Sequence, residues 1–83
     1  MEYVIAVYRS RNVSMQAYNY LLRNNVTCAL ISTPRAANVG CGLSVKFGRD
    51  VLPAVRQTLS RAETFVGFFL VRTTYGGVTL SRI

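Results

Sequence analysis

Apolar and polar residues along this chain alternate with two different periods, and each change of period marks a predicted element. Residues 3–8 are apolar on both faces and partly β-branched, which is typical of a central strand. A helix of about three turns is predicted after it, with Ser10 or Asn12 as its N-cap and Asn24-Asn25 as its stop. The apolar stripe of this helix has helical spacing and consists of Val13, Ala17, Tyr20 and Leu21.

Two short strands are predicted in the middle of the chain. In residues 26–32, one face carries Val26, Cys28 and Leu30, and the other face carries Thr27, Ala29 and Ile31. In residues 43–47, the expected buried face carries Leu43, Val45 and Phe47, and the other carries Ser44 and Lys46. This strict alternation predicts that one side of the third strand lies against the core and the other lies in solvent.

The last part of the chain predicts a helix and two strands. The helix opens at residues 48–50, with Asp50 as its cap and Pro53 within its first turn. Its apolar stripe consists of Val51, Leu52, Val55 and Leu59. Residues 65–72 form a strand that is apolar on both sides, and a turn at residues 75–77 leads into a last strand at residues 78–83.

The order of these elements predicts the fold class. Strand, helix, strand, strand, helix and strand, followed by a short extra strand, predict an α+β fold: a ferredoxin-like βαββαβ sandwich with an antiparallel sheet, two helices on one face and a short C-terminal strand. The length of 83 residues fits a single domain, residues 1–83. Two helices cover one face only, so the other face is expected without cover. We therefore expect a homodimer that forms through this face or through the last strand.

The chain is strongly basic. Its formal net charge of +7 comes from nine arginines and one lysine against three acidic residues. Such a surface attracts anions, so an acidic protein or RNA is a suitable partner. The arginines are spread along the sequence without a run, however, and general solubility is the simpler explanation for them.

The chain has two cysteines and no histidine. Tetrahedral zinc needs four ligands, so neither a metal site nor a resident cofactor is expected. No basic segment precedes the first apolar run, and no apolar segment approaches the ~20 residues that span a bilayer, so we expect a cytoplasmic protein without membrane contact. Thiols stay reduced in that compartment, although a Cys28–Cys41 disulfide is open in principle. Cys28 is expected in the core, with a role as a resolving thiol as the alternative.

The candidate site is the loop at residues 33–42, where Cys41 lies between Gly40 and Gly42. Glycines let backbone N–H groups converge on whatever Cys41 carries, and Arg35 offers a positive charge that favours a thiolate. The alternatives are a strained turn with a buried cysteine, and a surface Arg35 that pairs with Asp50. Without a histidine or a nearby acid as general base, a hydrolytic cysteine nucleophile is excluded.

The residues of this loop also carry a resemblance. Pro34-Arg35, a short polar stretch, Cys41-Gly42 and the Leu-x-Val-x-Phe strand that follows resemble the signature of a family of small bacterial proteins described as selenium/sulfur carrier-like. Ser10, Ala17 and Leu21 resemble the N-terminal helix pattern of that family, whereas residues 65–83 fit it less well.

The resemblance implies a carrier function. Cys41 would hold a persulfide or selenopersulfide, receive it from a sulfur- or selenium-mobilising enzyme, and deliver it to an acceptor protein. Arg35, Gly40 and Gly42 would stabilise the terminal anion, and Lys46 would help to bind an acidic donor. The residues do not distinguish sulfur from selenium, and they leave open whether the chain counts as a transferase-like enzyme.

Two other functions stay open from the sequence. One is a non-catalytic module that binds a small ligand at a dimer interface, without chemistry at sulfur. The other is an RNA- or tRNA-binding module, because this fold class includes RNA-recognition domains and the chain is basic. The second alternative is the weaker one, since the strand at residues 43–47 offers only Phe47 as an aromatic residue, on its apolar side.

Overall fold

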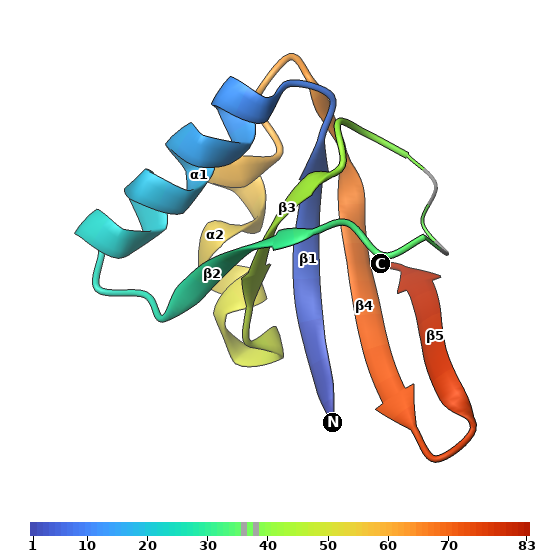
Figure 1. Cartoon of the computed structure of the whole chain (residues 1–83). Coiled ribbons are helices and arrows are strands. Elements are labelled where there is room, and N and C mark those ends of the chain that lie inside the picture. The colour runs from blue at the N-terminus through green and yellow to red at the C-terminus, as the bar shows by residue number, and fades with distance from the viewer. Residues whose placement is uncertain (36, 38) are drawn as a thin grey trace.

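The computed structural model describes residues 1–35, 37 and 39–83, which form one five-stranded antiparallel sheet and two α-helices (Figure 1). The elements are β1 (Glu2–Tyr8), α1 (Arg11–Arg23), β2 (Cys28–Ser32), β3 (Leu43–Phe47), a 3-10 turn η1 (Arg49–Val51), α2 (Leu52–Leu59), β4 (Phe65–Thr74) and β5 (Gly77–Arg82). The strand order is β2-β3-β1-β4-β5, and every neighbouring pair is antiparallel. The α+β class predicted from the sequence is therefore confirmed.

The ends of α1 follow the local sequence. The Ser10 side chain accepts a hydrogen bond from the Val13 amide at 3.3 Å, so Ser10 is the N-cap, as one of the two predicted candidates. After the helix, Asn25 adopts a left-handed φ of 60°, a conformation that asparagine tolerates, and the Val26 amide donates back to Leu21 O at 2.9 Å. This closing turn takes up Val26, so β2 begins two residues later than the sequence predicts, at Cys28.

The prediction that Asp50 caps the second helix is wrong. Gly48 is the N-cap of the 3-10 turn, where no side-chain cap bond forms, and Asp50 lies inside that turn. The α-helix begins only at Leu52 and carries proline in its first turn. Proline is tolerated there because its missing N–H would have no partner in the helix.

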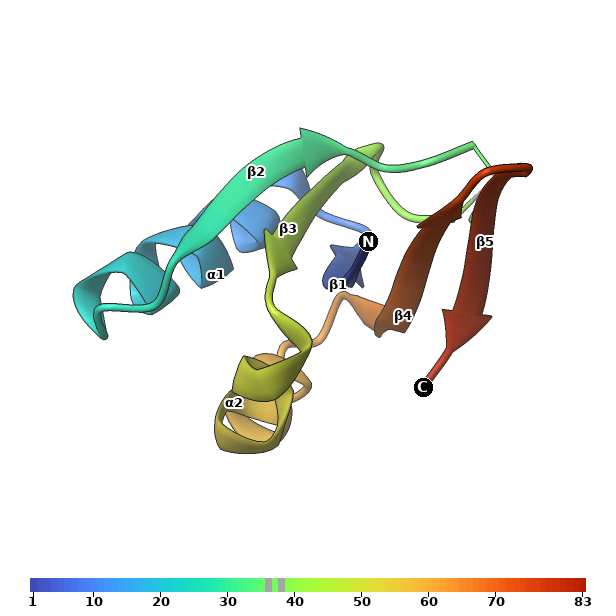
Figure 2. The same ribbon diagram turned by 90° about the horizontal axis from the view of Figure 1, so that it is seen from below.

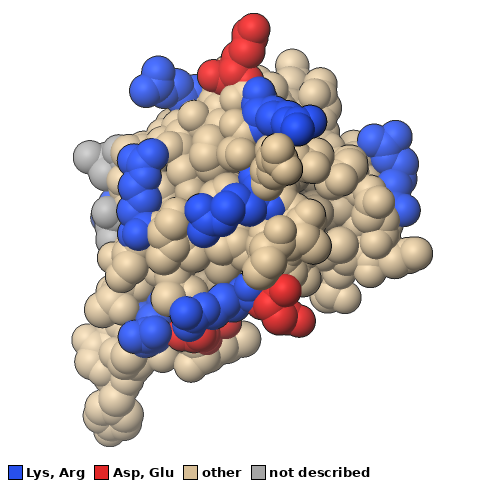
Figure 3. All heavy atoms as spheres, turned by 180° about the vertical axis from the view of Figure 1, so that it is seen from behind, with Lys and Arg blue, Asp and Glu red and all other residues tan. Residues whose placement is uncertain are grey.

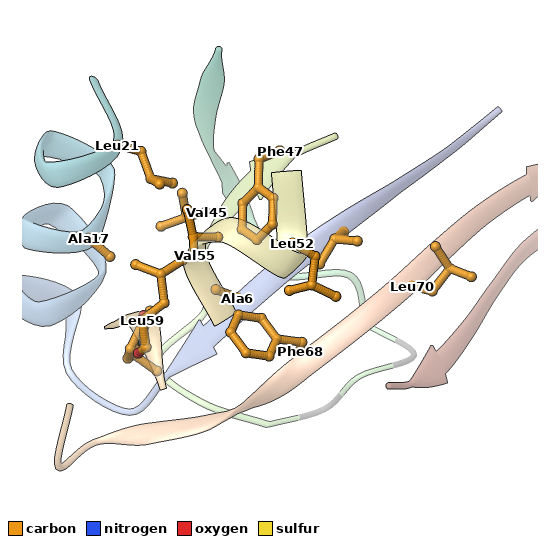
Figure 4. Packing of buried hydrophobic residues seen from close by; sticks show 12 residues of the cluster. Ala6, Ala17, Leu21, Val45, Phe47, Leu52, Val55, Leu59, Phe68 and Leu70 are labelled. Carbon is orange, nitrogen blue, oxygen red and sulfur yellow. Dashed lines mark hydrogen bonds between the residues drawn. The ribbon is translucent and has the colours of Figure 1, made fainter. Parts of the chain in front are cut away.

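The main core lies between the sheet and its two helices. Figure 2 shows α1 and α2 on one side of the sheet, and Figure 4 shows the side chains that fill the space between these layers. Phe47 and Phe68 meet edge to face, with ring centroids 6.5 Å apart. At the end of β1, the buried Tyr8 hydroxyl donates to Leu59 O at 2.8 Å and ties the strand to the end of α2. Burial raises the pKa of Tyr8 well above its usual range, so this donor keeps its proton.

The prediction of an uncovered opposite face is wrong for the centre of that face. Ile5, Val7 and Val71 are fully buried there, and half-buried apolar residues surround them. The connection between β2 and β3 lies on this side, beside β4 and β5 (Figures 1 and 2). Gly40 of this connection lies against the Val7 side chain, so the described part of the connection helps to bury this face.

Ser44 of β3 is a related correction. The sequence places it on a wet face, but its side chain is fully buried. Its hydroxyl lies 2.6 Å from the Thr33 hydroxyl at the end of β2, which satisfies both groups away from water.

None of the helices in the described part of the chain is long and apolar enough to cross a membrane.

Candidate functional site

The loop that carries Cys41 is closed at its base. The Thr33 amide donates to Gly42 O at 2.9 Å, which extends the pairing of β2 and β3 by one bond into the loop. The Thr33–Ser44 hydroxyl pair closes the same end from the side. Two positions of the predicted loop, Ala36 and Asn38, lie outside the described residues. The base of the loop therefore gives Cys41 a fixed starting point next to β3.

Glycine is required at the two positions beside Cys41 for different structural reasons. Gly40 has φ +79°, and a Cβ at this position would lie 2.6 Å from Val7 Cγ1 and 2.7 Å from Tyr8 O. Gly42 has φ +86°, but a Cβ there would meet nothing within 4 Å. Gly40 is therefore required for a close approach to β1, whereas Gly42 is required only for its left-handed backbone.

The backbone and the side chain of Cys41 are both held by polar contacts. Its amide donates to Tyr8 O at 3.0 Å, beyond the Val7–Ser44 pair that ends the β1–β3 ladder. Its thiol lies 3.6 Å from Leu43 O, as a donor, and 3.8 Å from Ser14 Oγ. The residue is half-buried. Since the Cys41 amide is already bonded, the amides of Gly40 and Gly42 are the candidates within the Gly-Cys-Gly segment to serve an anion beside the sulfur.

Ser14 belongs to this site, and sequence analysis missed it. It lies in the first turn of α1, is fully buried, and its hydroxyl lies 3.1 Å from Leu43 O and 3.3 Å from Ser10 O. A signal was present in the sequence, because Ser14 shares one helix face with Ala17 and Leu21 at positions 14, 17 and 21. A polar residue on the buried stripe of a helix needs a partner, and Cys41 lies next to it.

Arg35 lies on another side of the loop. It is exposed and lines an open hollow together with Gly40 and Gly42, while Cys41 is not part of that lining. Among the described residues, no hydrogen bond or ion pair joins Arg35 to Cys41 or to Asp50. The structure thus brings Arg35 and both glycines to one hollow and turns the sulfur of Cys41 toward α1.

Cys28 is too far from Cys41 to form a disulfide with it. Cys28 pairs with Phe47 at the far end of β3, whereas Cys41 precedes Leu43 at the near end. The four residue steps between these ends span about 13 Å, and a disulfide needs Cα atoms within about 7 Å. Both cysteines are free. The Cys28 thiol donates instead to Tyr18 O at 3.8 Å, and burial raises the pKa of this thiol. The sequence predicts Cys28 in the core, whereas the structure places it half-buried and packed against the core cluster.

Basic groups are dispersed over the face that Figure 3 shows, rather than gathered at one place on it. Figure 3 shows them on the face opposite to the view of Figure 1, separated by uncharged surface and by acidic groups. The Glu2 carboxylate forms ion pairs with Arg49 at 2.9 Å and with Arg72 at 3.1 Å. Both arginines lower the pKa of this carboxyl group, and Arg49 has the larger effect. Lys46 lies over the ring of Tyr3, with its Nζ 4.4 Å from the ring centroid.

The sheet offers little surface on which RNA bases could stack. Phe47 and Phe68 are buried under the helices, and on the opposite face the aromatic residues of the central strands, Tyr3 and Phe69, are half-buried around a fully buried centre. RNA-recognition sheets stack bases on exposed aromatic residues in their central strands. The geometry of the described residues therefore does not favour the RNA-binding alternative.

Comparison with known proteins relates the chain to a protein family. A family model described as "Putative Se/S carrier protein-like" matches residues 2–67, which include β1, α1, the Cys41 loop, β3, α2 and the start of β4. No curated protein and no solved structure matches the chain significantly. The remainder of β4 and the whole of β5 lie beyond the matched residues.

Proposed function

Because the chain belongs to this Se/S carrier protein-like family, we propose that it carries sulfur or selenium on Cys41 as a persulfide or selenopersulfide and delivers it to a partner protein. One structural observation supports the proposal more than any other. The only cysteine in the glycine loop is half-buried, and its sulfur is fixed against α1 instead of being packed in the core. Such a thiol combines a defined position with access for a second protein.

The loading step needs no oxidant. A donor enzyme presents a cysteine persulfide, and Cys41 Sγ attacks its terminal sulfur, so the new Sγ–S bond forms while the S–S bond of the donor breaks. The donor cysteine leaves as a thiolate and takes up the proton that Cys41 loses. Delivery repeats this exchange with an acceptor thiol. A selenopersulfide follows the same steps with selenium as the transferred atom.

The other residues of the loop support the anion that results. The amides of Gly40 and Gly42 and the guanidinium of Arg35 are suitable donors for a terminal sulfur or selenium anion, provided that the loaded Cys41 side chain turns from α1 toward their hollow. The first turn of α1 adds the partial positive charge of its amides near Sγ. We assign these roles on chemistry and placement, with Cys41 as the only covalent carrier.

The release of the cargo depends on a partner thiol. Cys28 is separated from Cys41 by the length of β3, so it does not resolve a persulfide on Cys41 within one chain. The carrier therefore keeps its cargo until an acceptor protein docks, and both donor and acceptor need only reach the loop. We propose a cytoplasmic setting, where reducing conditions keep both thiols free between transfers.

The test of the proposal is a loading experiment. The reduced protein is incubated with a cysteine desulfurase and cysteine, or with the same enzyme and selenocysteine, which loads the enzyme's own cysteine as a selenopersulfide, and its intact mass is measured. We expect a sulfur- or selenium-sized adduct that maps to residue 41 and disappears with reductant. No adduct with either donor, together with slow alkylation of Cys41, would contradict the carrier function and favour a ligand-binding module.

We also propose that the chain forms a homodimer through β5, and that its fold is of the ferredoxin-like type. β5 is an edge strand, and Val78 on it and Ile83 beside its end are exposed, which favours edge-to-edge pairing with a second copy. The strand order and the alternation of helices and strands support the fold assignment. Light scattering at micromolar concentration tests the dimer, and a monomeric mass would contradict it.

A further inference from the structure

Ser14 is a fully buried polar side chain that contacts the sulfur of the carrier cysteine. Its hydroxyl has one hydrogen and three acceptors within reach, which are Leu43 O at 3.1 Å, Ser10 O at 3.3 Å and Cys41 Sγ at 3.8 Å. Ser14 lies 27 positions from Cys41 in the sequence and on another element. The fold therefore brings a hydroxyl donor to the one sulfur that the loop presents.

The contacts of the Cys41 thiol change when it loses its proton. As a thiol, it donates to Leu43 O at 3.6 Å, while the Ser14 hydroxyl can donate to either backbone carbonyl. As a thiolate, Sγ has no hydrogen and can only accept, and a carbonyl oxygen is then an unfavourable neighbour. Among the polar side chains of the described residues, Ser14 is the one in contact with Sγ.

We propose that Ser14 is a positioning residue of the carrier site, whose hydroxyl turns from the backbone carbonyls to Cys41 Sγ when the thiol loses its proton. The use of this contact in sulfur or selenium transfer rests on the proposed function, but the contact itself does not. The hydroxyl holds the anionic sulfur on its α1 side, while the Cys41 amide holds the backbone on Tyr8 O. The attacking sulfur then has one fixed direction in which to meet a donor persulfide.

A matched pair of serine variants tests the proposal. Ser14 and Ser44 are both fully buried, but the Ser44 hydroxyl pairs with Thr33 and not with Cys41. In a Cys28→Ser background, Cys41 is alkylated over a range of pH values with iodoacetamide. We expect Ser14→Ala to slow alkylation near neutral pH by about tenfold, as for the loss of one hydrogen bond to a charged group, and to move the rise of the rate to higher pH. Ser44→Ala removes a pair at the base of the loop but no contact to Sγ, so whatever its effect on the overall rate, the pH at which the rate rises should not move.

A second pair covers the case in which Ser14→Ala does not fold. Threonine and valine have the same shape and differ in the hydroxyl, so Ser14→Thr should alkylate faster than Ser14→Val near neutral pH. Equal pH profiles for wild type and Ser14→Ala, or for the threonine and valine variants, would overturn the proposal. The alkylation experiment tests the Ser14 contact independently of the carrier function. A wild-type protein that is alkylated normally at Cys41 but takes up no sulfur or selenium would contradict only the carrier function.

Discussion

Replacing Cys41 by serine should remove the sulfur or selenium adduct completely, whereas replacing Cys28 by serine should leave the adduct at its wild-type level. A serine oxygen does not form the bond to sulfur or selenium that a thiolate forms. The serine can still donate to Leu43 O and accept from Ser14, so Cys41→Ser should keep the fold. Intact mass after incubation with donor enzyme and cysteine measures the adduct, and circular dichroism checks the fold of each variant.

Cys28 serves as the internal control because burial raises its pKa. A raised pKa keeps the thiol neutral to higher pH, so near pH 7 Cys28 has even less of the reactive thiolate than an exposed cysteine. In the Cys41→Ser variant, alkylation of the remaining thiol should stay slow at neutral pH and rise only in alkaline buffer. An adduct on Cys28 that is as large as the one on Cys41, under native conditions near pH 7, would contradict the assignment of a single carrier residue.

The periodicity of the sequence was sufficient to predict most of the fold. Every predicted strand and helix is present, with shifts of a few residues at the ends, since period, caps and turn residues act locally. The prediction that Asp50 caps the second helix was wrong because Gly48, two positions earlier, already starts a 3-10 turn. A local pattern offers several starts for a helix, and only the packing of the first turn decides among them.

The errors about the sheet have a different physical origin. The sequence rule that polar residues face water placed Ser44 in solvent, but Thr33, which directly follows the neighbouring strand β2, pairs with its hydroxyl. In the same way, counting helices left one face bare, although the connection between β2 and β3 lies on that face. Both errors concern contacts between distant segments, which no local period encodes.

The candidate site also has a part that local sequence predicts and a part that depends on contacts between distant segments. The loop, its glycines and its cysteine are contiguous in sequence, so they could be found as a motif. The Ser14 contact joins residues 27 positions apart and depends on the way α1 packs over the start of β3. The direction of Sγ toward α1, rather than toward Arg35, likewise follows from packing and could not be deduced from spacing.

Substituting alanine for Gly40 should lower the free energy of unfolding by about 3 kcal/mol, against about 1 kcal/mol for Gly42→Ala. Both glycines have left-handed φ values, of +79° and +86°, so both substitutions carry the same conformational penalty. Only at Gly40 would the new Cβ overlap other atoms, Val7 Cγ1 at 2.6 Å and the backbone oxygen of Tyr8 at 2.7 Å. Backbone and a buried valine cannot move aside as a flexible surface side chain could.

The Gly40→Ala substitution should also change the position of Cys41 Sγ. If the loop moves away from β1 to relieve the overlap, the bond from the Cys41 amide to Tyr8 O breaks, and Sγ leaves its place beside Ser14. Urea unfolding measures the stability of both variants, and persulfide loading measures the site. We expect Gly40→Ala to lose most of its loading rate at a urea concentration where it remains folded, and Gly42→Ala to keep it. An equal loss of loading rate in the two variants would contradict this prediction. It would mean that the close approach of Gly40 to β1 does not help to position the carrier thiol.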